Sequence, residues 1–118
     1  MDGASLTWSV EPREGVVIVR PSGRVDESTA VEFTDRLGQE VDAAGEAGRA
    51  LLALSLRGVE YMSSRGLRAL TLAQRRGAER GVRIALSEPT EVMREILTIS
   101  RYDMVFPVFA TTDEALLS

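Results

Sequence analysis

Residues 60–67 read Glu60-Tyr61-Met62-Ser63-Ser64-Arg65-Gly66-Leu67 and mark the point where a strand-like run gives way to a helical one. Upstream, residues 50–56 are apolar apart from one serine, as in a buried strand. Downstream, Leu67, Leu70 and Ala73 recur at helical spacing. We therefore place both serines at a helix N-terminus, where unpaired backbone N–H groups and the positive end of the helix dipole accept a hydroxyl cap or a phosphate.

The two serines have two interpretations. Serine is a common N-cap, so Ser63 or Ser64 serves only to begin the helix in the first interpretation. In the second, Ser64 is a switch that gains a phosphate at the helix N-terminus. The residues alone leave both interpretations open.

Length and charge narrow the class of protein. The 118 residues, 44% of them hydrophobic, fit one domain spanning residues 1–118. A net charge of −4 gives no electrostatic footprint for nucleic acid or an anionic membrane, so we expect a protein partner or a small ligand.

The N-terminal residues do not resemble a signal peptide, and no apolar run approaches the roughly 18 residues of a membrane span, so we expect a cytoplasmic protein.

The chain has no His and no Cys, and all 14 basic residues are Arg. This excludes cysteine nucleophiles, Ser-His triads, Schiff-base lysines and nearly all zinc sites. The acidic residues lie scattered, without the clustering of a magnesium site. We therefore expect a protein that is not an enzyme and that uses no cofactor or metal.

The periodicities predict an α/β domain with a mixed, largely parallel sheet and helices packed against it, in the order ββαβαβαβα. We expect a hairpin, a loop over 23–29 and then a helix whose buried face is Ala30, Phe33, Leu37, Val41 and Ala44. A second helix covers about 64–80 and closes at Gly81. The other predicted elements are strands at 6–10, 16–21, 50–56, 82–86 and 105–109, a third helix with Val92, Met93, Ile96 and Ile99 buried, and a terminal helix from 111.

Four local patterns, in this order and spacing, resemble the STAS domain of bacterial anti-sigma factor antagonists and sulphate transporter tails. The resemblance covers nearly the whole chain. The patterns are Gly23-Arg24-Val25-Asp26, Tyr61-Met62-Ser63-Ser64-Arg65-Gly66-Leu67, Pro89 with Val92 and Leu97, and Phe106-Pro107-Val108 before Asp113-Glu114-Ala115-Leu116.

The resemblance implies a phosphoacceptor at Ser64, with Ser63 as the next candidate, and an accompanying loop acid at Asp26. The family's loop usually reads Asp-Ser-Ser-Gly, so Ser63 stands here for the usual Asp, and Arg65 stands for a small residue. Arg65 adds a cation that can pair with phosphate. The partner-binding residues implied are Asp26, Tyr61, Met62, Ser63, Ser64, Arg65, Gly66 and Arg68. We expect Gly66 to permit close approach by a partner or by the packed sheet.

The resemblance implies a partner switch. The unphosphorylated protein binds a kinase-type anti-sigma factor and releases a sigma factor, phosphorylation at Ser64 blocks binding, and a serine phosphatase is a further expected partner. Two alternatives remain. One is a constitutive STAS subunit, for example of a lipid-transport ATPase, and the other is a small-ligand or nucleotide-binding module that uses the second helix's N-terminus.

Overall fold

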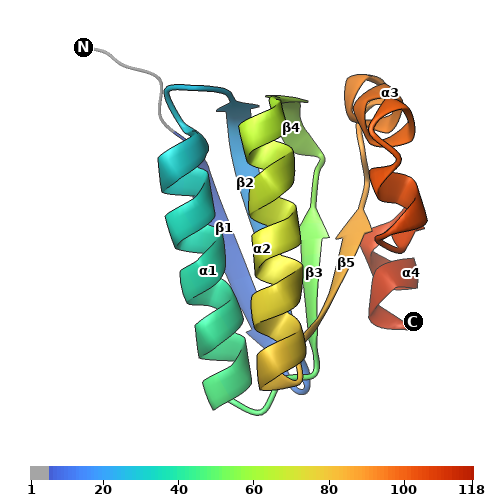
Figure 1. Ribbon diagram of the computed structural model, residues 1–118. Coiled ribbons are helices and arrows are strands. Elements are labelled where there is room, and N and C mark those ends of the chain that lie inside the picture. The colour runs from blue at the N-terminus through green and yellow to red at the C-terminus, as the bar shows by residue number, and fades with distance from the viewer. Residues whose placement is uncertain (1–5) are drawn as a thin grey trace.

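A six-stranded sheet forms the centre of the computed structural model, which describes residues 6–118 (Figure 1). The strand order is β1-β2-β3-β5-β6, and β4 lies beside β2. Only the β1–β2 pair of the described residues is antiparallel, which confirms the predicted largely parallel sheet. The strands are β1 Thr7–Arg13, β2 Val16–Val25, β3 Leu51–Ser55, β4 Gly58–Met62, β5 Arg83–Ser87 and β6 Val108–Phe109.

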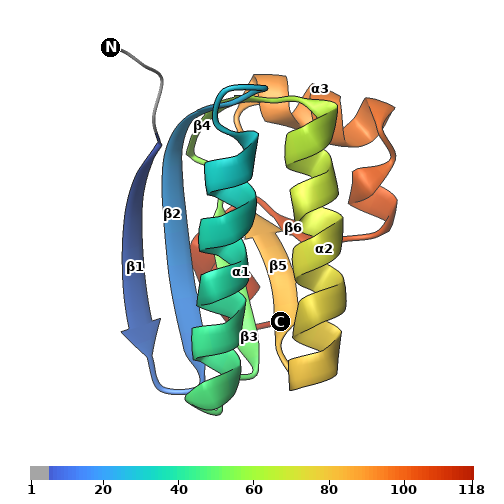
Figure 2. The same ribbon diagram turned by 60° about the vertical axis from the view of Figure 1, so that its left-hand side comes forward.

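Two long helices lie side by side over one face of the sheet, as both ribbon views show (Figures 1 and 2). The helices are α1 Ala30–Glu46, α2 Ser64–Arg80, α3 Glu91–Ile99, the 3-10 turn η1 Tyr102–Met104 and α4 Thr112–Leu116. Helices α1 and α2 begin at the end of the sheet where β2 and β4 end. No helix among residues 6–118 combines the length and the hydrophobicity needed to cross a bilayer.

The core explains why the two long helices form where the sequence predicts them. All five residues of the predicted α1 face are buried, each at most 3% exposed. Helix α2 ends at Gly81, whose φ of 74° is the left-handed conformation that glycine adopts readily. On the opposite face of the sheet, Ala115 of α4 packs with Leu51, Ala53 and Ala85.

Strand β2 differs from its predicted form, because it has ten residues and pairs with two strands in turn. Its first half, 16–19, pairs with β3, and residues 22–25 pair with β4, with a register shift between Gly23 and Arg24 within that pairing. The sequence analysis missed β4 and assigned 23–25 to a loop, so the predicted order lacked one strand. The backbone N–H and C=O groups of residues 22–25 and 58–62 are satisfied by hydrogen bonds between the two strands. The pattern of apolar and polar residues does not reveal this pairing.

The third helix differs from its predicted orientation. Met93 and Leu97 are buried as an i,i+4 pair, whereas Val92 is 48% and Ile99 83% exposed. The nine-residue helix packs through one narrow stripe, and the predicted buried face was too wide. The predicted last strand shrinks to the two residues of β6, which follow Pro107.

An ion-pair cluster joins α1 to α2 far from the serines. Asp42 accepts two hydrogen bonds from Arg76, at 2.9 and 2.8 Å, and Arg80 approaches it to 2.6 Å. The hydrogen bonds from Arg76, with the charges of both arginines, hold the pKa of Asp42 below its usual range. The C-terminal half of α2 is therefore tied to its neighbour.

Candidate functional site: the end of the sheet where α1 and α2 begin

The paired ends of β2 and β4 bring the loop acid and the serines together. Val25 and Met62 are Cα partners in the sheet, and the N–H of Ser63 donates to the carbonyl oxygen of Val25 at 2.8 Å. Asp26 follows Val25 directly, so the loop before α1 lies beside the N-terminus of α2. This juxtaposition matches the predicted placement of Asp26 beside the serine loop.

The two serines have different surroundings. Ser63 is the N-cap of α2, and its hydroxyl accepts a hydrogen bond from the N–H of Gly66 at 3.4 Å. Ser64 is the first residue of the helix and is exposed. Its hydroxyl makes no hydrogen bond to any of residues 6–118. Capping therefore occupies Ser63 and leaves the Ser64 hydroxyl accessible to another protein.

Asp26 shapes the loop before α1. Its Oδ1 accepts hydrogen bonds from the hydroxyl of Ser28 at 2.7 Å and from the N–H of Ser28 at 3.0 Å. These bonds, with the nearby charge of Arg24, lower the pKa of the Asp26 carboxyl, which is thus ionised at neutral pH. Ser28 is held by Asp26, and the N-cap position of α1 falls to Thr29.

Thr29, which the sequence analysis did not single out, fixes the same loop from inside. It is 1% exposed, and its hydroxyl donates to the carbonyl oxygen of Arg24 at 2.7 Å and accepts from the N–H of Asp26 at 3.0 Å. A threonine directly before a helical pattern is the signal that could have identified it. The loop is thus held by its own hydrogen bonds and presents Asp26 in a fixed position.

Charged side chains cross between the two loops. Arg65 pairs with Glu27 at 3.1 Å, and both side chains are exposed. Arg24 lies over the ring of Tyr61, 4.6 Å from its centroid, at the paired ends of β2 and β4. Glu27 and Arg24 were not predicted as site residues, because no spacing pattern links them to the serines.

Two of the predicted partner-binding residues are buried. Met62 is 2% exposed, and Gly66 lies against it in the core. A Cβ on Gly66 would overlap Met62 Cγ and lie 2.7 Å from Val25 Cγ1. Gly66 therefore permits close packing of α2 on the sheet, and both residues support the surface from beneath without offering a side chain to a partner.

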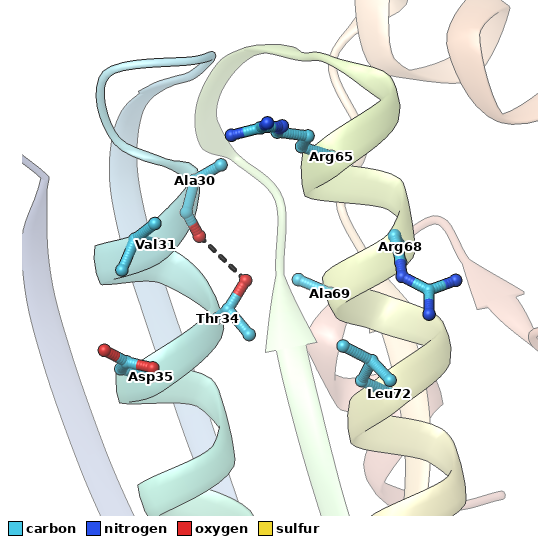
Figure 3. Close-up of a pocket in the computed structure, with 8 residues that line it drawn as sticks. All are labelled: Ala30, Val31, Thr34, Asp35, Arg65, Arg68, Ala69 and Leu72. Atoms are coloured by element: carbon cyan, nitrogen blue, oxygen red, sulfur yellow. Dashed lines mark hydrogen bonds between the residues drawn. The ribbon is translucent and has the colours of Figure 1, made fainter.

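A groove of about 350 Å³ runs between the first turns of α1 and α2 (Figure 3). Val31 and Leu72 are 66% and 38% exposed there, and Arg68 lies at its edge on α2. The full lining is Ala30, Val31, Thr34, Asp35, Arg65, Arg68, Ala69 and Leu72. Sequence analysis missed Val31 and Leu72, because they lie off the buried faces of their helices and nothing in the periodicity distinguishes them from ordinary surface residues.

The site presents an accessible hydroxyl, an ionised carboxylate and several guanidinium groups. No carboxylate of the described residues hydrogen-bonds the Ser64 hydroxyl. No group of three acidic side chains within residues 6–118 is placed to hold a metal ion. The arrangement suits docking by another protein and modification from outside.

Several solved structures are similar to this chain in fold. An anti-sigma factor antagonist from Mycobacterium paratuberculosis is 25% identical, with a TM-score of 0.76, over 95% of this chain and 92% of that one. The phosphorylated form of the Bacillus cell fate determinant SpoIIAA is 19% identical, with a TM-score of 0.66, over 93% and 96% of the two chains.

A sulfate transporter family protein from Wolinella succinogenes is also similar, with 24% identity and a TM-score of 0.73 over 87% of this chain and 83% of that one. The family model of the STAS domain matches residues 7–115, which is almost the whole chain. The chain therefore belongs to the STAS domain family.

Proposed function

We propose that this protein is an anti-sigma factor antagonist and that phosphorylation of Ser64 controls its binding. The observation that carries the proposal is that the two serines differ. Ser63 caps α2, whereas Ser64 is exposed and its hydroxyl makes no hydrogen bond with the described residues. The similarity to an anti-sigma factor antagonist over nearly the full length supports the same class. The partner is then a kinase-type anti-sigma factor in the cytoplasm, and a serine phosphatase reverses the modification.

The proposed mechanism is electrostatic. Without phosphate, the loop and α2 dock on the anti-sigma factor, which releases its sigma factor. Phosphorylation adds about −1.5 to −2 charges at Ser64, where Asp26 and Glu27 already place two carboxylates in the neighbouring loop. In a packed interface this charge is repelled or left desolvated, so binding is lost without refolding. The protein is the kinase's substrate and not a catalyst.

The test uses the purified protein, a kinase-type anti-sigma factor from the same bacterium and ATP, with the phosphate located by mass spectrometry. We expect phosphate on Ser64 and none in Ser64→Ala. Ser63→Ala is the matched control, because it removes the cap, which costs about 0.5–2 kcal/mol of stability, and leaves the acceptor in place. We expect it to melt earlier and still be phosphorylated.

Affinity measurements complete the test. Ser64→Ala should bind the anti-sigma factor constitutively, whereas Ser64→Asp should keep the fold and bind weakly. Phosphate on neither serine, or unchanged affinity in Ser64→Asp, would refute the switch.

The second candidate is a constitutive STAS binding module. Ser63 in place of the family's usual acid favours it, because a kinase that reads that acid finds none here. Stable binding to a transporter ATPase, with no phosphate incorporated, is the result that this candidate predicts.

A further inference from the structure

Two of the five arginines of α2 pair with no carboxylate among residues 6–118. Arg65 is engaged by Glu27, and Arg76 and Arg80 are engaged by Asp42. Arg68 and Arg75 make neither an ion pair nor a hydrogen bond with the described residues. Both are exposed guanidinium groups in a chain of net charge −4, so they are free to meet an external anion.

Arg68 differs from Arg75 in its surroundings. It lines the α2 side of the groove near the exposed Leu72, whereas the exposed Val31 lines the groove from α1 (Figure 3). Arg75 lies further along the helix and is not part of the groove lining. Asp35 lines the α1 side of the groove and, among residues 6–118, makes no ion pair, so the groove has a carboxylate on one side and the unpaired Arg68 on the other. Its α2 side is therefore complementary to an apolar side chain whose neighbouring carboxylate is directed toward Arg68 and away from Asp35.

We infer that the groove receives an apolar side chain of the anti-sigma factor, that Arg68 pairs with a carboxylate beside it, and that phosphate on Ser64 competes for Arg68. The inference rests on the proposed function and names the partner's chemistry at that site. Phosphorylation then removes the cation that the partner needs, in addition to adding negative charge.

Helix geometry selects Arg68 as the residue that meets the phosphate. Ser64 and Arg68 are an i,i+4 pair, and such pairs are neighbours on a helix surface, whereas i and i+1 do not face each other. Arg65 extends toward the start of α1, where Glu27 holds it. An arginine that meets a phosphate forms charge-assisted hydrogen bonds, which are among the stronger ones on a protein surface.

The first test needs no partner. Phosphoserine is incorporated at position 64 by genetic encoding, and its second pKa, near 6 in the absence of partners, is measured by phosphorus NMR. We expect the pKa to be higher by about 0.5 in Arg68→Ala than in the parent, because the guanidinium favours the dianion. Arg75→Ala is the matched control and should titrate as the parent does. Equal pKa values in all three proteins would overturn the inference.

The second test measures affinity for the kinase-type anti-sigma factor. We expect Arg68→Ala and Val31→Gln each to weaken binding by about five-fold or more, and Arg75→Ala by less than about two-fold. Ser64→Asp should cost less affinity in the Arg68→Ala background than in the parent, since the two changes act on one contact. The inference would be contradicted if the affinity losses of Ser64→Asp and Arg68→Ala were additive, or if Arg68→Ala bound the anti-sigma factor as tightly as Arg75→Ala.

The two proposals fail in different ways. If the kinase leaves Ser64 unmodified, the proposed function is wrong, whatever the phosphorus titration shows. If Ser64 is phosphorylated and binding is lost while Arg68→Ala changes neither the titration nor the affinity, the switch stands and the role of Arg68 is wrong.

Discussion

Replacing Gly66 with alanine tests how closely α2 must approach the sheet beneath Ser64. The new Cβ would overlap Met62 Cγ and lie 2.7 Å from Val25 Cγ1. Both neighbours are buried, at 2% and 0% exposure, and Val25 is β-branched, so neither moves easily. Overpacking of this kind costs about 1–3 kcal/mol, whereas alanine's better helix propensity returns up to about 1 kcal/mol. We expect a net loss of about 1–2 kcal/mol.

The assay is thermal and urea unfolding of Gly66→Ala beside Gly38→Ala. Gly38 lies inside α1, and its added Cβ would meet only the exposed guanidinium of Arg76, whose shift would loosen its hydrogen bonds to Asp42. The small stabilisation that a surface ion pair contributes is offset by alanine's better helix propensity, so Gly38→Ala should be close to neutral. For Gly66→Ala we expect the melting temperature to fall by about 4–8 °C. Gly66→Ala that is as stable as Gly38→Ala would refute the close-packing argument.

Two further predictions concern carboxylates. Asp26→Asn should leave the melting temperature nearly unchanged, because an amide oxygen accepts the same hydrogen bonds from Ser28. It should weaken binding to the anti-sigma factor, as measured by calorimetry. A variant that unfolds but binds normally per folded molecule would contradict this prediction. The lowered pKa values of Asp42 and Glu11, each of which pairs with two arginines, indicate that these carboxylates stabilise the fold above about pH 4, and this stabilisation is lost as the pH falls further. The melting temperature should thus drop below pH 4, and a flat profile down to pH 2 would refute the assignment.

The parts of the fold that the sequence predicts well are those with long, strict periodicity. The α1 face and the start and end of α2 follow from apolar spacing, a serine cap and Gly81. Strand β4 was not predicted, because Glu60 interrupts this five-residue segment and a register shift falls within its pairing with β2. The orientation of α3 was also predicted wrongly, because Val92 and Ile99 are apolar but the nine-residue helix buries only a narrow stripe.

The candidate site, like the fold, has features that the sequence predicts and features that it does not. The serines and Asp26 are adjacent in space, as the resemblance predicts, because the ends of two paired strands bring them together. The burial of Met62 and Gly66 is set by packing between β4 and α2, and local sequence does not specify it. The groove beside Arg68 depends on the distance between two helices, which periodicity leaves undetermined.

The two-part pairing of β2 makes this domain suitable for building chimaeras. Residues 16–19 pair with β3 in the interior of the sheet, whereas 22–25 pair with β4 at the end where α1 and α2 begin. A donor protein's residues can therefore replace 22–29 and 58–68 while every pairing of β2 with β3 and of β3 with β5 is kept. Two short cassettes would then carry a donor's residues at positions 26, 64 and 68 onto this scaffold, while Val31 and Leu72 of the groove remain those of the recipient.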